Sequence, residues 1–321
     1  MYILLIFLQI KYKTLPNEEE RMNIIERSDL ACEIAGNGKS LCRGAEWKTR
    51  EVAGFVISEL IIGTKEASDK LEKPCGRYLT VECGRIDLLT SESHRALAHL
   101  LAGELRGTVT RLTHKAIDSN LAVFVAGLGN ADLTPDAIGP QTMRRLIATR
   151  HLRQYERDLY QAVGCSSLSA LAPGVLGQTG IETSELLRGA VNTTHPDVIV
   201  VIDALTARSC DRLCATIQLS DTGIEPGSGV GNHRKAITYK SMGVPVIALG
   251  VPTVVNSATL VWDALREAGI DGENPTLKEV LERGKSFFVS PKESDLICER
   301  VAQLFARAIG LAFTEELVDA E

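Results

Sequence analysis

Short apolar runs along this chain alternate with segments in which apolar residues recur every three or four positions. The runs predict buried strands and the recurring positions predict amphipathic helices. Strands are predicted at 54–62, 77–82, 121–126, 168–172, 198–202, 215–219 and 244–249, and helices at 88–105, 135–150, 182–191, 255–267 and 292–311. Strands separated by helices predict an α/β fold, a three-layer, mostly parallel sheet with helices on both faces, of the phosphorylase/hydrolase-like kind.

The stretch 121–140 combines a predicted strand, a glycine turn and the start of a helix. Asp136 falls where the carboxyl end of the strand meets this helix, and open α/β sheets place their chemistry at that edge. A second acid, Asp203, directly follows the predicted strand 198–202. The two are 203 − 136 = 67 residues apart, about two βα units, so neighbouring strands can bring them together.

Two carboxyl groups at close range cannot both ionise easily, so one keeps a proton while the other remains a base. Such a pair can activate a water molecule against an amide and protonate the leaving nitrogen. A plainer interpretation is that Asp136 caps a helix and Asp203 only ends a strand, since aspartate is common at both places. The residues by themselves leave both interpretations open.

Other chemistries are less well supported by the motifs. The dinucleotide fingerprint fails because Asp132 stands where the glycine after Gly127 and Gly129 should be. No phosphate-binding Walker loop and no Gly-x-Ser-x-Gly elbow occur in the chain. The glycine-rich loop 223–231 predicts either a turn or a close approach to a ligand. His233 is expected to be a loop residue and not a base.

Composition narrows the possible partners. The chain of 321 residues carries a net charge of -6 with a pI near 5.7, which argues against direct binding of nucleic acid. Its eight cysteines lack zinc-ligand spacing, so we expect reduced thiols, no metal and no cofactor.

No signal peptide or membrane-spanning segment is predicted, which favours a cytoplasmic protein. Residues 1–21 are expected to be an extension, with Met22 a plausible start.

Six motifs resemble, in order, the germination protease family of spore-forming bacteria, over roughly residues 28–313. They are GLGNADLTPDAIGP (127–140), APGVLGQTGIETSE (172–185), VIDALTARS (201–209), IQLSDTGIEPGSGVGNHRKAI (217–237), GVPVIALGVPTVV (243–255) and VSPKESD (289–295). The resemblance implies an atypical aspartic endopeptidase that degrades small acid-soluble spore proteins in the spore core during germination. It matches the catalytic aspartates to Asp136 and Asp203 and implies a homo-oligomer, a tetramer.

The chain is also distantly similar to hydrogenase maturation endopeptidases, which share the Gly-x-Gly-Asn loop followed by an acid. Two alternatives therefore accompany the aspartic peptidase: a metal-dependent maturation-type endopeptidase and a non-catalytic α/β binding protein. In the preferred mechanism the loop of Gly127, Gly129 and Asn130 supplies backbone N–H groups to the developing oxyanion. Asp132 is a third acid near Asp136 that could be mistaken for a member of the pair.

The family resemblance also implies a proenzyme that trims itself at a substrate-like sequence: a hydroxyl residue, an acid, a large apolar residue, alanine, any residue and glutamate. Residues 28–33, SDLACE, fit this pattern. We therefore predict cleavage between Asp29 and Leu30, so that residues 1–29 form a removable extension and pro-segment and residues 30–321 a single peptidase domain. The acid before the cleaved bond predicts a cationic pocket, for which Arg208, Arg234 and Lys235 are the candidates.

Overall fold

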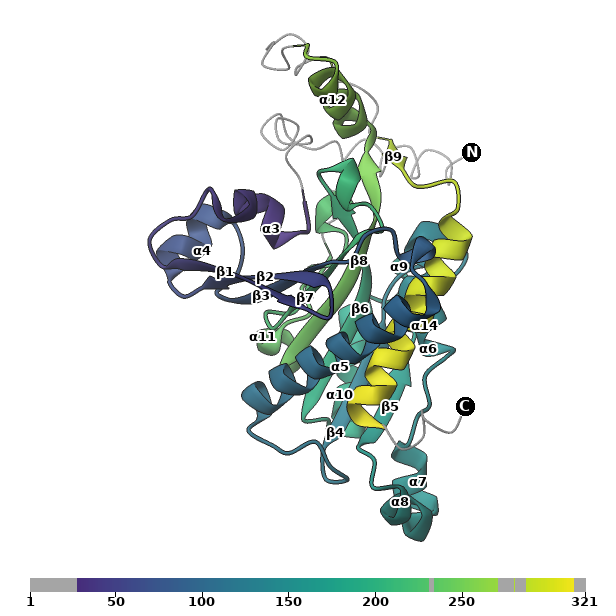
Figure 1. Ribbon diagram of the computed structural model, residues 1–321. Helices are drawn as coiled ribbons and strands as arrows, with labels where there is room; N and C mark the ends of the chain where they lie inside the picture. Colours follow the sequence, from purple (N-terminus) through teal and green to yellow (C-terminus); the bar gives the residue numbers. More distant parts are fainter. Residues whose placement is uncertain (1–27, 231–233, 271–279, 281–286, 315–321) are drawn as a thin grey trace, which may run out of the picture.

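The computed structural model describes residues 28–230, 234–270, 280 and 287–314. Within these residues one nine-stranded sheet runs through the centre of the molecule in the order β1-β2-β3-β7-β8-β6-β4-β5, with β9 paired to β8 (Figure 1). The strands are β1 (Ala45–Val52), β2 (Phe55–Ile62), β3 (Gly76–Glu82), β4 (Ala122–Gly127), β5 (Ser167–Leu171), β6 (Val198–Ala207), β7 (Thr216–Ser220), β8 (Val246–Asn256) and β9 (Phe288–Val289).

The predicted α/β architecture is confirmed, but among the described strands the sheet is mixed and not mostly parallel, with three parallel and five antiparallel pairings. Strands β5, β4, β6 and β8 are parallel to their neighbours. Strands β7, β3, β2 and β1 extend the sheet from β8 by antiparallel pairing. The turn between β1 and β2 consists of Ala53 and Gly54, both with positive φ, and a two-residue turn of this kind joins antiparallel strands.

Helices cover both faces of the sheet, as predicted (Figure 1). On one face α5 (Ser91–Thr113), α14 (Ser294–Phe313) and α6 (Ile138–Met143) pack together, over a core that includes Val200 and Ile202 of β6. On the other face lie α10 (Thr183–Thr194) and α11 (Tyr239–Met242), which pack on Ile199 and Val201. The alternation of these β6 side chains between two clusters shows that the strand is buried on both faces, as its apolar run predicts.

The remaining helices are short or peripheral to this core. They are α3 (Ala31–Ile34), α4 (Lys65–Leu71), α7 (Arg150–Tyr155), α8 (Arg157–Val163), α9 (Leu176–Thr179) and α12 (Ser257–Glu267), and single 3-10 turns occur at η2 (Gly36–Gly38), η3 (Ile86–Leu88), η4 (Thr134–Asp136), η5 (Cys210–Arg212) and η6 (Ser228–Val230). The N-terminal elements α3 and α4 lie beside β1, β2 and β3, away from α5 and α14 (Figure 1).

Several predicted boundaries are wrong. The helix expected to continue to residue 150 ends at Met143, and the helix expected at 182–191 runs from Thr183 to Thr194. The largest difference concerns β6, which continues past Ile202 to Ala207. It continues because it pairs with β8 as far as Val255, across an irregularity after Leu205. Asp203 therefore lies within a strand instead of after one.

Candidate active site

Asp136 is held by the loop that follows β4. Its carboxylate Oδ2 accepts a hydrogen bond from the backbone N–H of Asn130 at 2.8 Å. Gly129 has φ +109°, and a Cβ built on it would lie 1.9 Å from the backbone oxygen of Asp136, so only glycine fits here. The carboxylate thus closes the preceding loop and makes no cap for α6, whose start has no side-chain hydrogen bond. The helix-cap interpretation of Asp136 is therefore wrong.

Asp203 is buried, with 6% of its surface exposed, and faces Gly250 across the β6–β8 pair. Its Oδ1 accepts a hydrogen bond from the backbone N–H of Ala204 at 3.0 Å. Burial, followed by the charges of Asp136 and Asp29, raises the pKa of Asp203 well above its usual value. Burial also raises the pKa of Asp136, against the opposing effect of the Asn130 N–H. The fold therefore brings both predicted carboxyl groups into one electrostatically coupled site.

Asp29, whose charge also acts on Asp203, belongs to the predicted processing sequence. Its backbone N–H donates to the carbonyl oxygen of Thr206 at 3.0 Å, while its Oδ2 accepts from the N–H of Thr206 at 2.9 Å. Its Oδ1 accepts from the hydroxyl of Ser228 at 2.8 Å. Gly229 packs so closely on this carboxylate that a Cβ there would lie 2.3 Å from Oδ2. A shaped polar pocket therefore encloses the side chain that precedes the predicted cleaved bond.

The residues after Asp29 are bound equally closely. Leu30 and Ala31 are both 0% exposed, and Leu30 packs with Leu205 and Val255. The carboxylate of Glu33 accepts hydrogen bonds from the N–H groups of Arg208 and Ser209 at 2.8 and 2.9 Å, and from the hydroxyl of Ser28. The hydroxyl, acidic, apolar, alanine and glutamate positions of the sequence pattern therefore each have a defined environment.

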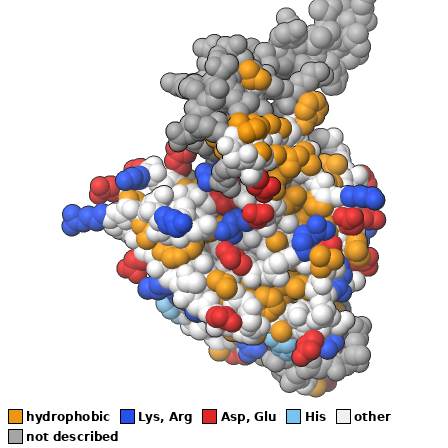
Figure 2. All heavy atoms as spheres, turned by 45° about the horizontal axis from the view of Figure 1, so that its top comes forward, with side chains coloured by type: hydrophobic (Ala, Val, Ile, Leu, Met, Phe, Trp, Pro, Cys, Tyr) orange, Lys and Arg blue, Asp and Glu red, His pale blue; other side chains and the backbone are white. Residues whose placement is uncertain are grey.

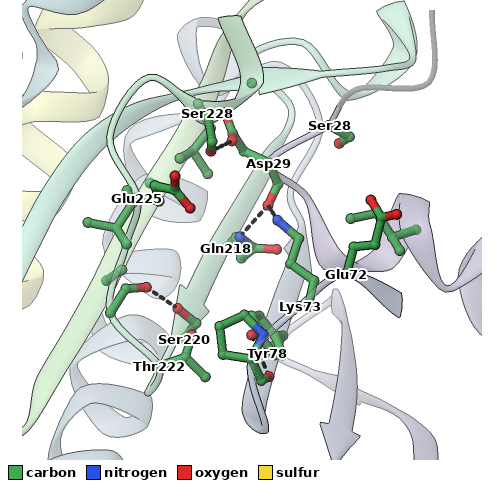
Figure 3. A pocket seen from close by; sticks show the side chains of 18 of the residues that line it. Ser28, Asp29, Glu72, Lys73, Tyr78, Gln218, Ser220, Thr222, Glu225 and Ser228 are labelled. Atoms are coloured by element: carbon green, nitrogen blue, oxygen red, sulfur yellow. Dashed lines mark hydrogen bonds between the residues drawn. The ribbon is translucent and has the colours of Figure 1, made fainter. Parts of the chain in front are cut away.

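Two further side chains contact the peptide bond between Asp29 and Leu30 (Figure 3). Nε2 of Gln218 donates to the carbonyl oxygen of Asp29 at 3.0 Å, and its Oε1 accepts from the N–H of Ala31 at 2.7 Å. Nζ of Lys73 donates to the same carbonyl oxygen at 3.3 Å. Both side chains project into a cavity of about 750 Å³. Asp136 and Asp203 do not line it, although Gly250, the β8 neighbour of Asp203, does.

The predicted cationic residues lie elsewhere. Arg234 and Lys235 pair with Glu182 and Glu185 at 3.9 and 2.7 Å, at the start of α10. Arg208 borders the cavity, but its hydrogen bond to the docked segment comes from its backbone. The Asp29 carboxylate is thus bound by a hydroxyl and a backbone N–H, and the role predicted for these cations is not supported by their positions.

Sequence reasoning missed Lys73, Thr206, Gln218 and Ser228. Ser228 stands in the glycine-rich loop and Thr206 in the VIDALTARS motif, so both could have been considered. Gln218 stands in the motif 217–237 and could have been considered as well, whereas Lys73 carries no local signal because its partner is far away in the sequence. His233 and residues 1–27 of the predicted pro-segment lie outside the described residues.

The residues that the structure describes contain no group of three or more His, Cys, Asp or Glu side chains arranged to hold a metal ion. They also contain no helix that is long and apolar enough to span a membrane. Figure 2 shows one face, on which hydrophobic side chains gather near the residues drawn in grey and charges of both signs are interspersed. On the described part of this face, no broad area of one charge sign stands out.

The α/β sheet, its coupled carboxyl groups and the peptide segment bound beside them are features of a peptidase. Residues 23–267 match the family model described as germination protease. The chain is 35% identical to the germination protease of Clostridium acetobutylicum, over 91% of this chain and 94% of that one. It is 40% identical to the germination protease of Priestia megaterium, over 91% of this chain and 80% of the relative. The chain therefore belongs to the germination protease family.

One solved structure that the chain matches is the [NiFe] hydrogenase maturation protease HycI of Thermococcus kodakarensis. It is 17% identical and covers 64% of this chain and 98% of its own, with a TM-score of 0.34. Likeness at this level supports no conclusion about mechanism or metal use.

Proposed function

We propose that this chain is a self-processing endopeptidase that uses Asp136 and Asp203 and degrades small acid-soluble spore proteins in the spore core, as a homo-oligomer. The substrate, the location and the tetrameric assembly follow from the family resemblance. The catalytic pair and the processing site are supported by the geometry. In this proposal residues 1–29 are the pro-segment and residues 30–321 the peptidase domain.

One observation carries the proposal: the predicted processing sequence docks on β6, the strand that carries Asp203. Asp29 pairs with Thr206, three positions along β6 from Asp203, and its charge is one of the causes that raise the pKa of Asp203. A pro-segment that only covered the surface would not need a defined pocket for its acid, its leucine and its glutamate. A chain folded around its own cleavage sequence is expected of an enzyme that trims itself.

In the proposed mechanism Asp203 holds a proton and Asp136 is the base. The deeper burial of Asp203 and its two acidic neighbours favour its protonated form. Burial also raises the pKa of Asp136, but the hydrogen bond that it accepts from the Asn130 N–H opposes this shift, and within the described residues Asp203 has no such neighbour beyond Ala204 to offset its two acidic neighbours. Asp136 takes a proton from water as the water oxygen bonds to the carbonyl carbon of Asp29. The C–N bond then breaks, and Asp203 gives its proton to the nitrogen of Leu30. The proton on Asp136 returns to Asp203 through solvent, which restores the pair.

The experiment follows conversion of the full chain by electrophoresis and N-terminal sequencing. Wild type should yield a product that begins at Leu30. Asp136→Asn and Asp203→Asn should each convert about 10² to 10⁴ times more slowly, the usual contribution of acid–base catalysis. Asp132→Asn is the matched control, because Asp132 is an exposed acid near the same loop. Conversion of either pair variant at the wild-type rate contradicts the assigned mechanism.

The same preparation tests the two alternatives. Loss of conversion with a chelator and its recovery with zinc or nickel would favour the metal-dependent peptidase. A wild-type chain that neither converts nor cleaves a spore-protein peptide under any condition would favour the binding protein.

A further inference from the structure

We propose that Lys73 and Gln218 form the oxyanion-binding pair of this peptidase, with Nζ and Nε2 directed at the carbonyl oxygen of the residue before the cleaved bond. The inference rests on the proposed function, because it takes Asp29–Leu30 as the bond that is cut. It concerns two residues on the antiparallel side of the sheet, whereas the carboxyl pair lies on β6 and in the loop after β4.

Gln218 is placed to hold both sides of that bond. Its amide group donates to the Asp29 carbonyl at 3.0 Å and accepts from the Ala31 N–H at 2.7 Å. The backbone of a neighbouring strand would make the same two hydrogen bonds, to the Asp29 carbonyl and the Ala31 N–H. The Gln218 side chain therefore holds residues 29–31 in an extended conformation. Gln218 is 8% exposed, and it occupies the same register position on β7 as Asp203 does on β6, both opposite Gly250. Residues at matched positions project from the same face of a sheet.

Lys73 reaches the same oxygen beside Gln218 (Figure 3). It follows the C-cap of α4, where Glu72 has φ +51° and turns the chain toward the cavity. Burial lowers the pKa of Lys73, and the nearby carboxylates of Asp29 and Glu225 oppose this shift. The carbonyl thus receives one neutral donor and one amine donor.

Two donors on one carbonyl oxygen suit the chemistry of the step. When the water oxygen bonds to the carbonyl carbon, the C=O electron pair moves onto oxygen and creates a negative charge. Donors already directed at that oxygen stabilise the charge without reorganisation, and they do so more strongly away from bulk water. The charge returns to the carbonyl as the C–N bond breaks, so neither Lys73 nor Gln218 gains or loses a proton.

This assignment differs from the one based on the Gly127–Asn130 loop. In the structure the Asn130 N–H donates to Asp136, and the Leu128 N–H donates to the carbonyl oxygen of Ile202. These groups hold the catalytic loop together, whereas the Lys73 and Gln218 donors already contact the peptide.

The test uses the full chain and its first-order conversion rate, which is independent of chain concentration for a reaction in cis. Lys73→Met and Gln218→Glu each remove a donor, and Gln218→Glu keeps an oxygen for the Ala31 N–H. Lys65→Met and Gln303→Glu are matched controls at exposed positions. Loss of one oxyanion donor typically lowers the rate about 10² to 10³-fold. Lys73→Arg should retain more activity than Lys73→Met, because arginine keeps an N–H donor for the same carbonyl oxygen.

A second readout separates catalysis from positioning. Hydrogen exchange of residues 28–33 is measured in chains that also carry Asp203→Asn, so that the segment remains uncleaved. The inference predicts slow conversion with unchanged exchange. If Lys73→Met and Gln218→Glu convert within about three-fold of wild type, the inference is overturned. Slow conversion of Asp203→Asn in the same experiment would still support the proposed function. Slow conversion with proportionally faster exchange also overturns it, because the residues then only hold the segment. Wild-type conversion by Asp203→Asn overturns the proposed function and the inference together.

Discussion

Asp29 and Thr206 exchange two hydrogen bonds, one from the backbone N–H of Asp29 at 3.0 Å and one to its carboxylate at 2.9 Å. Thr206 of β6 therefore binds both the backbone and the side chain of Asp29. This contact orients the Asp29 carboxylate toward the Ser228 loop and turns the following Leu30 into the core. The docked segment and the carboxyl pair can therefore be tested separately, by substitutions in each.

Ser228→Ala should slow conversion of the full chain. The Ser228 hydroxyl donates to the Asp29 carboxylate at 2.8 Å, and a hydrogen bond to a charged group contributes about 1.5 to 3 kcal/mol. A rate lower by a factor of about 10 to 100 is expected from gel densitometry. Ser91→Ala, at an exposed position on α5, should convert like wild type. Equal rates for the two variants would show that Ser228 does not contribute to recognition.

Glu33→Gln should loosen the carboxyl-terminal side of the docked segment. The two oxygens of Glu33 accept from two backbone N–H groups and a hydroxyl, and an amide would turn an NH₂ group toward one of these donors. Slower conversion, by about ten-fold or more, and faster hydrogen exchange at residues 28–33 are expected together. Glu66→Gln on the exposed surface of α4 is the control. Unchanged exchange in Glu33→Gln would contradict this role.

Asp203→Asn should change how stability depends on pH. The folded pKa of Asp203 is raised, so between the unfolded value and the folded value the native chain binds more protons than the unfolded chain. The stability from Asp203 is therefore present at low pH and is lost as pH rises through the folded pKa. Asparagine does not titrate, so urea unfolding of uncleaved chains should show the variant gaining stability relative to wild type as pH increases. Parallel stability curves would contradict the raised pKa.

Gly129→Ala should destabilise the catalytic loop. The left-handed backbone and the collision with the Asp136 oxygen together should cost about 2 to 5 kcal/mol of unfolding free energy. Gly103→Ala is the matched control, because it lies in α5 with no atom near the added methyl group, and it should stabilise by about 0.5 to 1 kcal/mol. Urea titration measures both changes. An unchanged unfolding free energy in Gly129→Ala would show that the loop around Asp136 accommodates the added methyl group.

Arg234→Met and Lys235→Met should leave the preference for an acid before the cleaved bond unchanged. Their side chains pair with Glu182 and Glu185, which lie outside the Asp29 pocket. The measurement compares cleavage of chains that carry aspartate or asparagine at position 29, in each variant background. If the aspartate and asparagine chains differed less in cleavage rate in the Arg234 or Lys235 variants than in wild type, the result would support the cationic pocket predicted from the sequence.

The sequence by itself determined the fold class and the family. Local periodicity marks β4 and β6 as buried strands, because apolar runs between turn residues have few other stable arrangements. The same pattern placed Asp136 and Asp203 at the carboxyl edge of a parallel sheet, where strand direction alone predicts that they meet. Their catalytic roles stay a prediction, as does the processing site.

Only the tertiary structure decided which groups surround the docked segment. Asp29 meets Thr206 and Ser228 across 177 and 199 residues of sequence, and no local pattern encodes a contact at that separation. Strand β6 extends past Asp203 because β8 pairs with it, and the antiparallel half of the sheet is what brings Gln218 and Lys73 to the peptide. Charge suggested Arg234 and Lys235, but pairing with nearby glutamates directs them elsewhere. Long-range strand pairing, which depends on the packing of the whole core, therefore defined the site.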